Sequence, residues 1–129
     1  MNDTMPITTP LVRVVARPSD ASLRGDIFGG WVFSQMDIAG GIVAAEIGGD
    51  RIATVAIDAM RFLRPVKVGD TLSVYGRVER TGRTSIVVYL EAWVRRGRIG
   101  ADEKVTEGKF TFVALDDAGR PKLVAIPNE

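Results

Sequence analysis

One stretch constrains the fold more than any other part of the chain: residues 25–49, which read GDIFGGWVFSQMDIAGGIVAAEIGG. Its apolar residues lie around nearly the whole circumference of a helix, and a helix that is apolar on every side is buried. Asp26 is placed to cap the start, and Gly48 and Gly49 are placed to end the helix, because glycine adopts left-handed backbone geometry at little cost. The polar residues within the stretch leave it too short for a membrane span. We therefore predict one long buried helix.

The middle of this predicted helix has two unusual features. Gly40 and Gly41 are adjacent, although glycine in a helix interior costs about 1 kcal/mol relative to alanine. They indicate the close approach of a sheet wrapped around the helix, or of a ligand lying along it. Asp37 is a carboxylate with no basic residue within one helical turn. From the residues alone, it is either a reactive carboxylate or a structural one bonded to backbone amides or to a strand hydroxyl.

The composition excludes several classes of chemistry. The chain contains no Cys, which excludes disulfides and thiolate nucleophiles, and no His, which excludes Ser-His-Asp catalysis and ordinary zinc sites. The reactive groups of an enzyme with this sequence are therefore carboxylates, hydroxyls, backbone amides, Lys or Arg, and no metal site is expected. The net charge of +1 favours neither nucleic acid nor a membrane as a partner. The first ten residues do not resemble a secretory signal, so we expect a cytoplasmic protein.

Alternating and β-branched runs predict five strands, at residues 11–16, 51–62, 70–80, 84–96 and 103–115. Residues 1–10 are predicted to form a loose arm of a single domain that spans residues 1–129. The later strands are joined by short loops, which makes neighbouring strands antiparallel. One sheet must curl around the helix to bury it, and one side of the helix and a sheet edge still remain uncovered. We therefore predict an α+β fold and a homodimer in which two sheets continue edge to edge.

Three segments of the chain carry a resemblance to a known family: PSDASLRGDIFGGWVFSQMDIAGG, TVAIDAMRFLRPVKVGDTLSVYGRVERTGRTSI and FTFVALDDAGRP. Together they cover most of the sequence, and the chain closely resembles the YciA-type acyl-CoA thioesterases, which have the hotdog fold, a curved antiparallel sheet around one central helix. The turn before the helix departs from the family, because Ser22, Leu23 and Arg24 stand where relatives commonly carry Asn. This departure concerns loop contacts and substrate preference.

The resemblance implies hydrolysis of acyl-CoA thioesters to a free acid and CoA, at a site shared between two subunits. It implies that Asp37 acts as general base or nucleophile. It also implies that Asp26, from the opposite side of the interface, helps to place the carbonyl or the water. No cofactor is implied, because CoA is part of the substrate. Relatives commonly assemble as dimers or as trimers of dimers.

The residues suit this chemistry. A thiol has a pKa near 8.5, judged by cysteine, so a thiolate leaves without a strong general acid, and an enzyme without histidine loses little. Backbone amides around Gly29, Gly30 and Trp31, at the positive end of the helix, are suited to a developing oxyanion. Asp37 lies about two turns (~10 Å) beyond Gly30, so one chain separates these groups and a partner chain is needed to unite them. The alternatives are helix capping for Asp26 and tight helix–sheet packing for the two glycines.

Basic residues supply candidate contacts to the CoA phosphates. Arg64 and Lys67 lie in one predicted loop, and further arginines lie near hairpin ends, at positions 80, 83, 95, 96 and 98. The turn that contains Arg83, Thr84 and Ser85 offers amides and hydroxyls to phosphate, although a solvated loop fits the same residues. Ser34 and Gln35 are placed to orient a water molecule.

Three other functions are alternatives to a thioesterase. A non-catalytic acyl-CoA sensor on the same fold is the main alternative, and the lack of a DNA-binding segment disfavours it. A hotdog dehydratase or hydratase normally works with a His, which this sequence lacks. A purely structural dimer leaves Asp37 and the glycine-rich helix start without a role.

Overall fold

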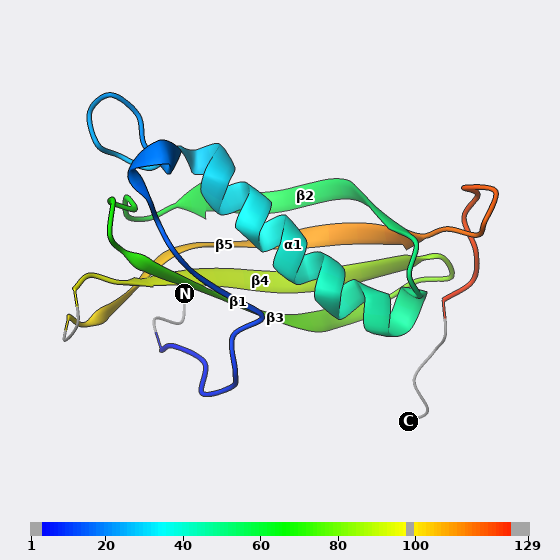
Figure 1. Cartoon of the computed structure of the whole chain (residues 1–129). Coiled ribbons are helices and arrows are strands. Elements are labelled where there is room, and N and C mark those ends of the chain that lie inside the picture. The colour runs from blue at the N-terminus through cyan, green and yellow to red at the C-terminus, as the bar shows by residue number, and fades with distance from the viewer. Residues whose placement is uncertain (1–3, 98–99, 125–129) are drawn as a thin grey trace.

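A computed structural model describes residues 4–97 and 100–124 of the chain. One long helix lies across one face of a five-stranded sheet (Figure 1). The elements, in chain order, are β1 (Val12–Val15), a 3-10 turn (Pro18–Asp20), α1 (Gly29–Gly48), β2 (Ile52–Phe62), β3 (Thr71–Thr81), β4 (Ser85–Arg95) and β5 (Asp102–Ala114). The predicted strands are all present, with ends within about two residues of those expected from the alternation. The predicted α+β architecture is confirmed.

The sheet has the strand order β1-β3-β4-β5-β2, and every neighbouring pair is antiparallel. Hairpins join β3 to β4 and β4 to β5, whereas β2 pairs with the far side of β5 and forms one edge of the sheet. Side chains alternate between the two faces along each strand, and in the central strand β4 most residues of both faces are buried. This order places the strand that follows α1 at an open edge, beside the helix.

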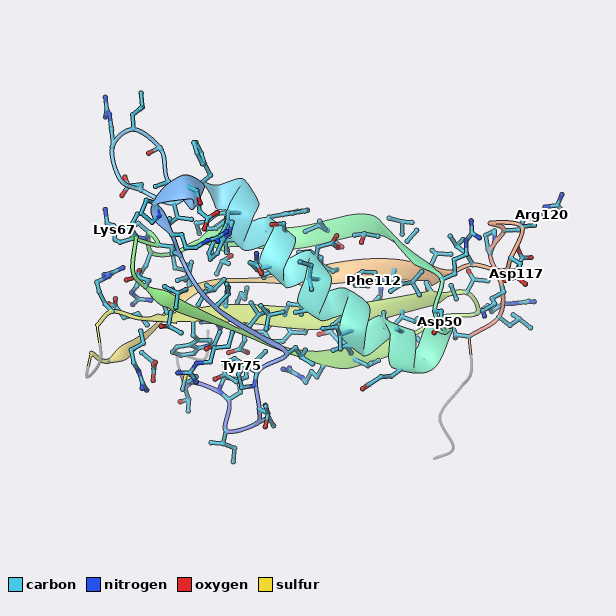
Figure 2. All side chains as sticks on the ribbon, viewed as in Figure 1. Asp50, Lys67, Tyr75, Phe112, Asp117 and Arg120 are labelled. Carbon is cyan, nitrogen blue, oxygen red and sulfur yellow. The ribbon has the colours of Figure 1, made fainter. Side chains whose placement is uncertain are left out.

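The core lies between α1 and the inner face of the sheet. Buried side chains come from the helix and from β3, β4 and β5, including Val32, Met36, Ala39, Val43, Leu72, Val74, Val88, Leu90, Phe110 and Phe112. A Cβ atom at Gly40 would lie 2.7 Å from the Cζ of Phe112 and 3.0 Å from the Cδ1 of Leu90. Figure 2 shows Phe112 beneath the helix. The sheet is therefore what approaches Gly40. At Gly41 the packing is looser, because a Cβ atom there would lie 3.8 Å from the Cδ1 of Ile52, its nearest neighbour.

The helix begins four residues later than predicted, and Asp26 does not cap it. Phe28 is the N-cap residue, and its side chain makes no capping hydrogen bond. Asp26 instead forms a β-bridge with Lys67, and the amide of Ile27 donates to the carbonyl of Val66 at 3.0 Å. This pairing with the loop before β3 holds the backbone extended where the sequence pattern predicted helix. The prediction of a cap at Asp26 was wrong.

Within one chain the helix is not buried on every side. Phe33, Ile38 and Ile42 are 38%, 54% and 45% exposed, and Val55 on the neighbouring edge strand β2 is 57% exposed. Exposed apolar side chains therefore occur both on the helix and on the open sheet edge, the two parts that the sequence predicted to remain uncovered. No helix in the described part of the chain is long and apolar enough to cross a membrane.

The edge strand β2 is irregular. Its register with β5 shifts between Thr54 and Ala56 and again between Asp58 and Arg61, and Ala59 has a φ of 54°. Each shift changes which face the following residues occupy. As a result Thr54, Ile57 and Phe62 lie opposite Phe112, Phe110 and Thr106, respectively. The two shifts thus place Thr54 and Phe62 on the helix side of the sheet.

Candidate active site

Asp37 is half-buried in the middle of α1, where it meets the edge strand. The hydroxyl of Thr54 on β2 donates a hydrogen bond of 2.6 Å to its Oδ1. No other hydrogen bond to this carboxylate forms among residues 4–97 and 100–124. One oxygen is therefore held by a strand hydroxyl, while the other is available to a water molecule or a ligand. Thr54 was missed in the sequence analysis, because only the strand register reveals its side.

The start of the helix offers two of the three predicted amides. The amide of Trp31 donates to the carbonyl of Phe28 at 3.0 Å, so it is not an open donor, contrary to the prediction. A Cβ at Gly30 would meet no atom within 4 Å, and one at Gly29 would meet the ring of Phe62 at 3.4 Å. The backbone at Gly30 is thus open to an approaching group. Ser34 donates its hydroxyl to the carbonyl of Trp31 at 2.9 Å, so its proton is engaged within the helix rather than at Asp37.

A cavity of about 410 Å³ lies beside the helix start. Its wall consists of residues 62–66, from the end of β2 and the loop after it, together with Ile27, Gly29 and Val32. Most of these residues are apolar, and Arg64 is the charged one. The structure therefore brings Gly29 and Arg64 together at one site. Asp37 is not part of this wall, so a single chain leaves the cavity and the carboxylate apart, as the helix spacing predicted.

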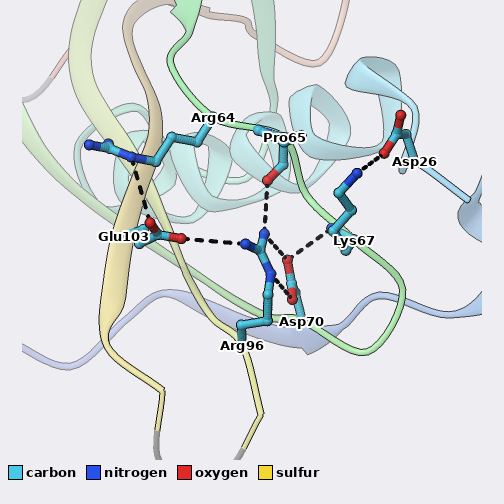
Figure 3. Close-up of polar contacts among 7 residues, drawn as sticks. All are labelled: Asp26, Arg64, Pro65, Lys67, Asp70, Arg96 and Glu103. Atoms are coloured by element: carbon cyan, nitrogen blue, oxygen red, sulfur yellow. Dashed lines mark hydrogen bonds and ion pairs between the residues drawn. The ribbon is translucent and has the colours of Figure 1, made fainter.

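The basic residues at this end of the molecule are engaged in ion pairs (Figure 3). Lys67 pairs with Asp26, and both side chains are about half exposed. Arg64 donates to the carbonyl of Lys104 at 2.8 Å and lies 3.8 Å from Glu103. Asp26 is therefore tied to the loop that also carries Arg64, at the same end as the cavity.

Arg95, the last residue of β4, and Arg96, directly after it, have different partners. Arg96 donates to both oxygens of Asp70, at 3.0 and 2.9 Å, and to the carbonyl of Pro65 at 3.2 Å. Arg95 pairs instead with Asp102, at 3.1 and 2.9 Å. The hydrogen bonds that each guanidinium donates to its carboxylate partner raise the pKa of that guanidinium. Arg98, another predicted candidate, lies outside the described residues.

The structure does not bring Arg83, Thr84 and Ser85 to the cavity of the same chain. They form the β3–β4 hairpin, and the adjacent Ile86 would lie 2.8 Å from a Cβ at Gly48, the last residue of the helix. The hairpin therefore lies near the helix end, whereas the cavity lies at the helix start. The carbonyl of Thr84 accepts from the amide of Ala114 at 2.9 Å, and that of Arg83 from Val124 at 2.9 Å. Figure 2 shows the separation of the two ends, with Lys67 at one and Asp117 and Arg120 at the other.

No group of three or more His, Cys, Asp and Glu side chains is arranged to hold a metal ion within the part of the chain that the structure describes. The groups that the structure places on the helix and beside it are the Asp37 carboxylate, the Thr54 hydroxyl and the backbone at the helix start.

Comparisons with known proteins agree with this geometry. Residues 24–101 match the model of the thioesterase superfamily. The acyl-CoA thioester hydrolase YciA of Escherichia coli K12 is 44% identical over 119 residues, which cover 90% of this chain and 90% of the relative. Among solved structures, the hexameric broad-specificity acyl-coenzyme A thioesterase HI0827, in an aspartate-to-alanine form, is 44% identical with a TM-score of 0.85, covering 94% of this chain and 88% of its own. An acyl-CoA hydrolase of Staphylococcus aureus is 28% identical with a TM-score of 0.80, and the match covers 92% of this chain and 74% of the hydrolase chain.

A long helix is packed on a five-stranded antiparallel sheet, and the chain is similar over most of its length to these thioesterase structures. The fold is therefore the hotdog fold, and the class of protein is a thioester hydrolase. The chain belongs to the thioesterase superfamily and, within it, to the YciA-type acyl-CoA thioester hydrolases. The resemblance, fold class and enzyme class predicted from the sequence are confirmed.

Proposed function

We propose that this chain hydrolyses acyl-CoA thioesters to a free carboxylic acid and CoA, with Asp37 as the general base that activates water. The observation that carries the proposal is the state of the Asp37 carboxylate. It is half-buried, fixed through one oxygen by Thr54 and open at the other. A base needs this combination of fixed orientation and a free lone pair. Direct attack by the same carboxylate on the thioester is the alternative use of the open oxygen.

The relatives support a role for both residues of this pair. HI0827 was solved as an aspartate-to-alanine form, and the S. aureus hydrolase as an aspartate-to-alanine form and a threonine-to-alanine form. In the numbering of the S. aureus hydrolase these two residues lie 17 positions apart, the same separation as that of Asp37 and Thr54. The hydroxyl of Thr54 orients the Asp37 carboxylate, so Thr54 is a positioning residue.

The developing negative charge falls on the thioester oxygen. The open backbone at Gly30, with its neighbour Gly29, supplies amides at the positive end of α1 for this oxygen. The CoA thiolate then leaves unprotonated or takes a proton from water, because thiols are much more acidic than alcohols. The acyl chain extends from the thioester into the adjacent apolar cavity of about 410 Å³.

The separation of the helix start from Asp37 requires a second chain. The exposed apolar side chains of Phe33, Ile38 and Ile42 on α1, and of Val55 on the open β2 edge, offer apolar surface that a second copy would bury. Because HI0827 is hexameric, we propose a homodimer that assembles further into a trimer of dimers. In this assembly Asp26, Arg83, Thr84 and Ser85 reach the active site or CoA from a neighbouring subunit.

A thiol-release assay with several acyl-CoAs tests the proposal. The wild type is expected to release CoA, and Asp37→Ala is expected to lower kcat by about 100-fold or more, the scale of a lost general base. The oligomer should remain intact by light scattering. A wild type that binds CoA without turnover would instead identify an acyl-CoA sensor, and near-normal turnover by Asp37→Ala would make Asp37 structural.

A further inference from the structure

Arg96 contacts three different segments at the helix-start end of the molecule. Its guanidinium donates to both oxygens of Asp70, to the carbonyl of Pro65 at 3.2 Å, and to Glu103 at 3.5 Å (Figure 3). It therefore joins the end of β4 and the start of β5 to the loop between β2 and β3. A guanidinium is suited to this task because it presents several donors in a fixed plane.

Asp70 is buried, and its carboxylate needs the guanidinium of Arg96 as a partner. Its side chain is 1% exposed, and its Oδ2 also accepts from the amide of Lys67 at 2.8 Å. A buried carboxylate without a cationic partner is strongly unfavourable, so Asp70 holds Arg96 in place. Lys67 in turn pairs with Asp26, which extends the chain of contacts to the segment before α1.

The loop held in this way is the wall of the cavity. Residues 62–66 line it, and Arg96 reaches the wall directly at the carbonyl of Pro65. Two further backbone bonds fix the wall on either side, from the amide of Leu63 to Val105 at 2.6 Å and from Ile27 to the carbonyl of Val66 at 3.0 Å. Between them, no other side-chain bond to Pro65 forms within the described residues. Arg96 is therefore the side chain that holds the wall at Pro65, while Arg64 next to it is held separately at the carbonyl of Lys104.

We propose that Arg96 is a positioning residue that sets acyl-chain selectivity: it holds the loop of residues 63–70 and so fixes the width of the acyl cavity. This inference rests on the proposed function, in which the acyl chain occupies that cavity. Loss of the contact allows the wall to move relative to Gly29, which changes the fit of long chains more than that of short ones. Arg96 itself touches neither the thioester nor the reacting water.

The chain offers a matched control in the neighbouring arginine. Arg95 makes a comparable two-point ion pair with Asp102, but its partner lies at the start of β5 rather than in the cavity loop. The guanidiniums are similarly exposed, at 41% for Arg95 and 48% for Arg96. Arg96→Gln and Arg95→Gln thus remove the same charge and the same kind of pair.

The experiment compares these two variants in the full chain by two readouts. We expect the ratio of kcat/KM for octanoyl-CoA to that for acetyl-CoA to change by about tenfold in Arg96→Gln and to stay near the wild-type ratio in Arg95→Gln. Backbone amide exchange across residues 63–70 should be faster only in Arg96→Gln. Arg96→Lys, which retains the charge but not the planar set of donors, should lie between wild type and Arg96→Gln.

An unchanged ratio, an equal change in both variants, or unchanged exchange in the loop would overturn the inference. If Arg96→Gln does not fold, Arg96→Gln combined with Asp70→Asn removes the unpaired buried charge and carries the same expectations. A wild type without turnover would overturn the proposed function instead, and the exchange measurement would still decide whether Arg96 holds the loop.

Discussion

The surroundings of Asp37 and Asp70 differ in almost every respect. Asp70 is nearly inaccessible, and both of its oxygens are bonded, to Arg96 and to the amide of Lys67. Asp37 is half-buried, has one hydroxyl partner among the described residues and lies on a helix whose exposed apolar side chains a second chain can cover. A carboxylate whose lone pairs are all engaged stabilises a loop, whereas one with an open lone pair is available for proton transfer. The number and kind of partners, rather than burial alone, separates the two roles.

The largest expected difference concerns turnover. Asp37→Asn keeps the shape of the side chain and an acceptor for Thr54 but removes the basic oxygen. We expect kcat/KM to fall by about 100-fold, which corresponds to about 2.7 kcal/mol of transition-state stabilisation, while the Tm changes little. Steady-state kinetics and calorimetry on the same samples check both halves. A large loss of Tm would place Asp37 in the same structural class as Asp70.

The second prediction concerns Asp70, where we expect a loss of stability rather than of turnover. Arg96→Ala leaves the buried Asp70 carboxylate without its cation. We expect the free energy of unfolding to fall by about 2 kcal/mol, because water that enters the space of the guanidinium hydrates this carboxylate only in part. Urea denaturation measures this change. Asp70→Asn combined with Arg96→Ala should recover part of the loss, because no buried charge remains. Equal stability of single and double variants would contradict this account of Asp70.

The sequence predicted more of the fold than of the site. Strand ends could be predicted because alternation is a local signal, and Asp37 stood out because no basic residue neighbours it in the helix. The helix start could not be placed, because Ile27 pairs with Val66, a contact between residues far apart in the chain. Thr54 was missed for a related reason: its side of the sheet follows from its pairing with Phe112, a residue far away in the chain. Arg83 and Arg96 were both placed near hairpin ends, but the sequence does not reveal that the β3–β4 turn lies near the helix end and the β4–β5 turn near the helix start.

A smaller effect is expected at the partner of Asp37. Thr54→Val is nearly isosteric and removes only the hydroxyl that donates to Oδ1. Loss of this hydrogen bond should lower kcat by about tenfold, the equivalent of about 1.4 kcal/mol, because the carboxylate loses its fixed orientation. Thr54→Ser, which keeps the donor, is the control and should retain most of the activity. If serine and valine behaved alike, the hydroxyl would have no part in positioning Asp37.

The smallest predicted effect concerns a third carboxylate, Glu107, which resembles Asp70 rather than Asp37. The buried ammonium of Lys104 donates to it, as does the hydroxyl of Tyr89 at 2.9 Å. The hydrogen bond from Lys104 lowers the pKa of Glu107 below its ordinary value of 4.5, against an opposing contribution from burial. Burial, followed by the bond to Glu107, raises the pKa of the Tyr89 hydroxyl, which therefore remains a donor.

A group whose pKa is lower in the folded state contributes stability above its unfolded pKa and loses it as the pH falls through the folded value. The free energy of unfolding should therefore decline below about pH 4.5 in the wild type, with Glu107 contributing about 1 kcal/mol or less. Glu107→Gln should flatten this acid limb, measured by urea denaturation from pH 6 to pH 3. If the acid dependence of stability were the same in Glu107→Gln as in the wild type, the ion pair with Lys104 would not hold the pKa of Glu107 below its ordinary value.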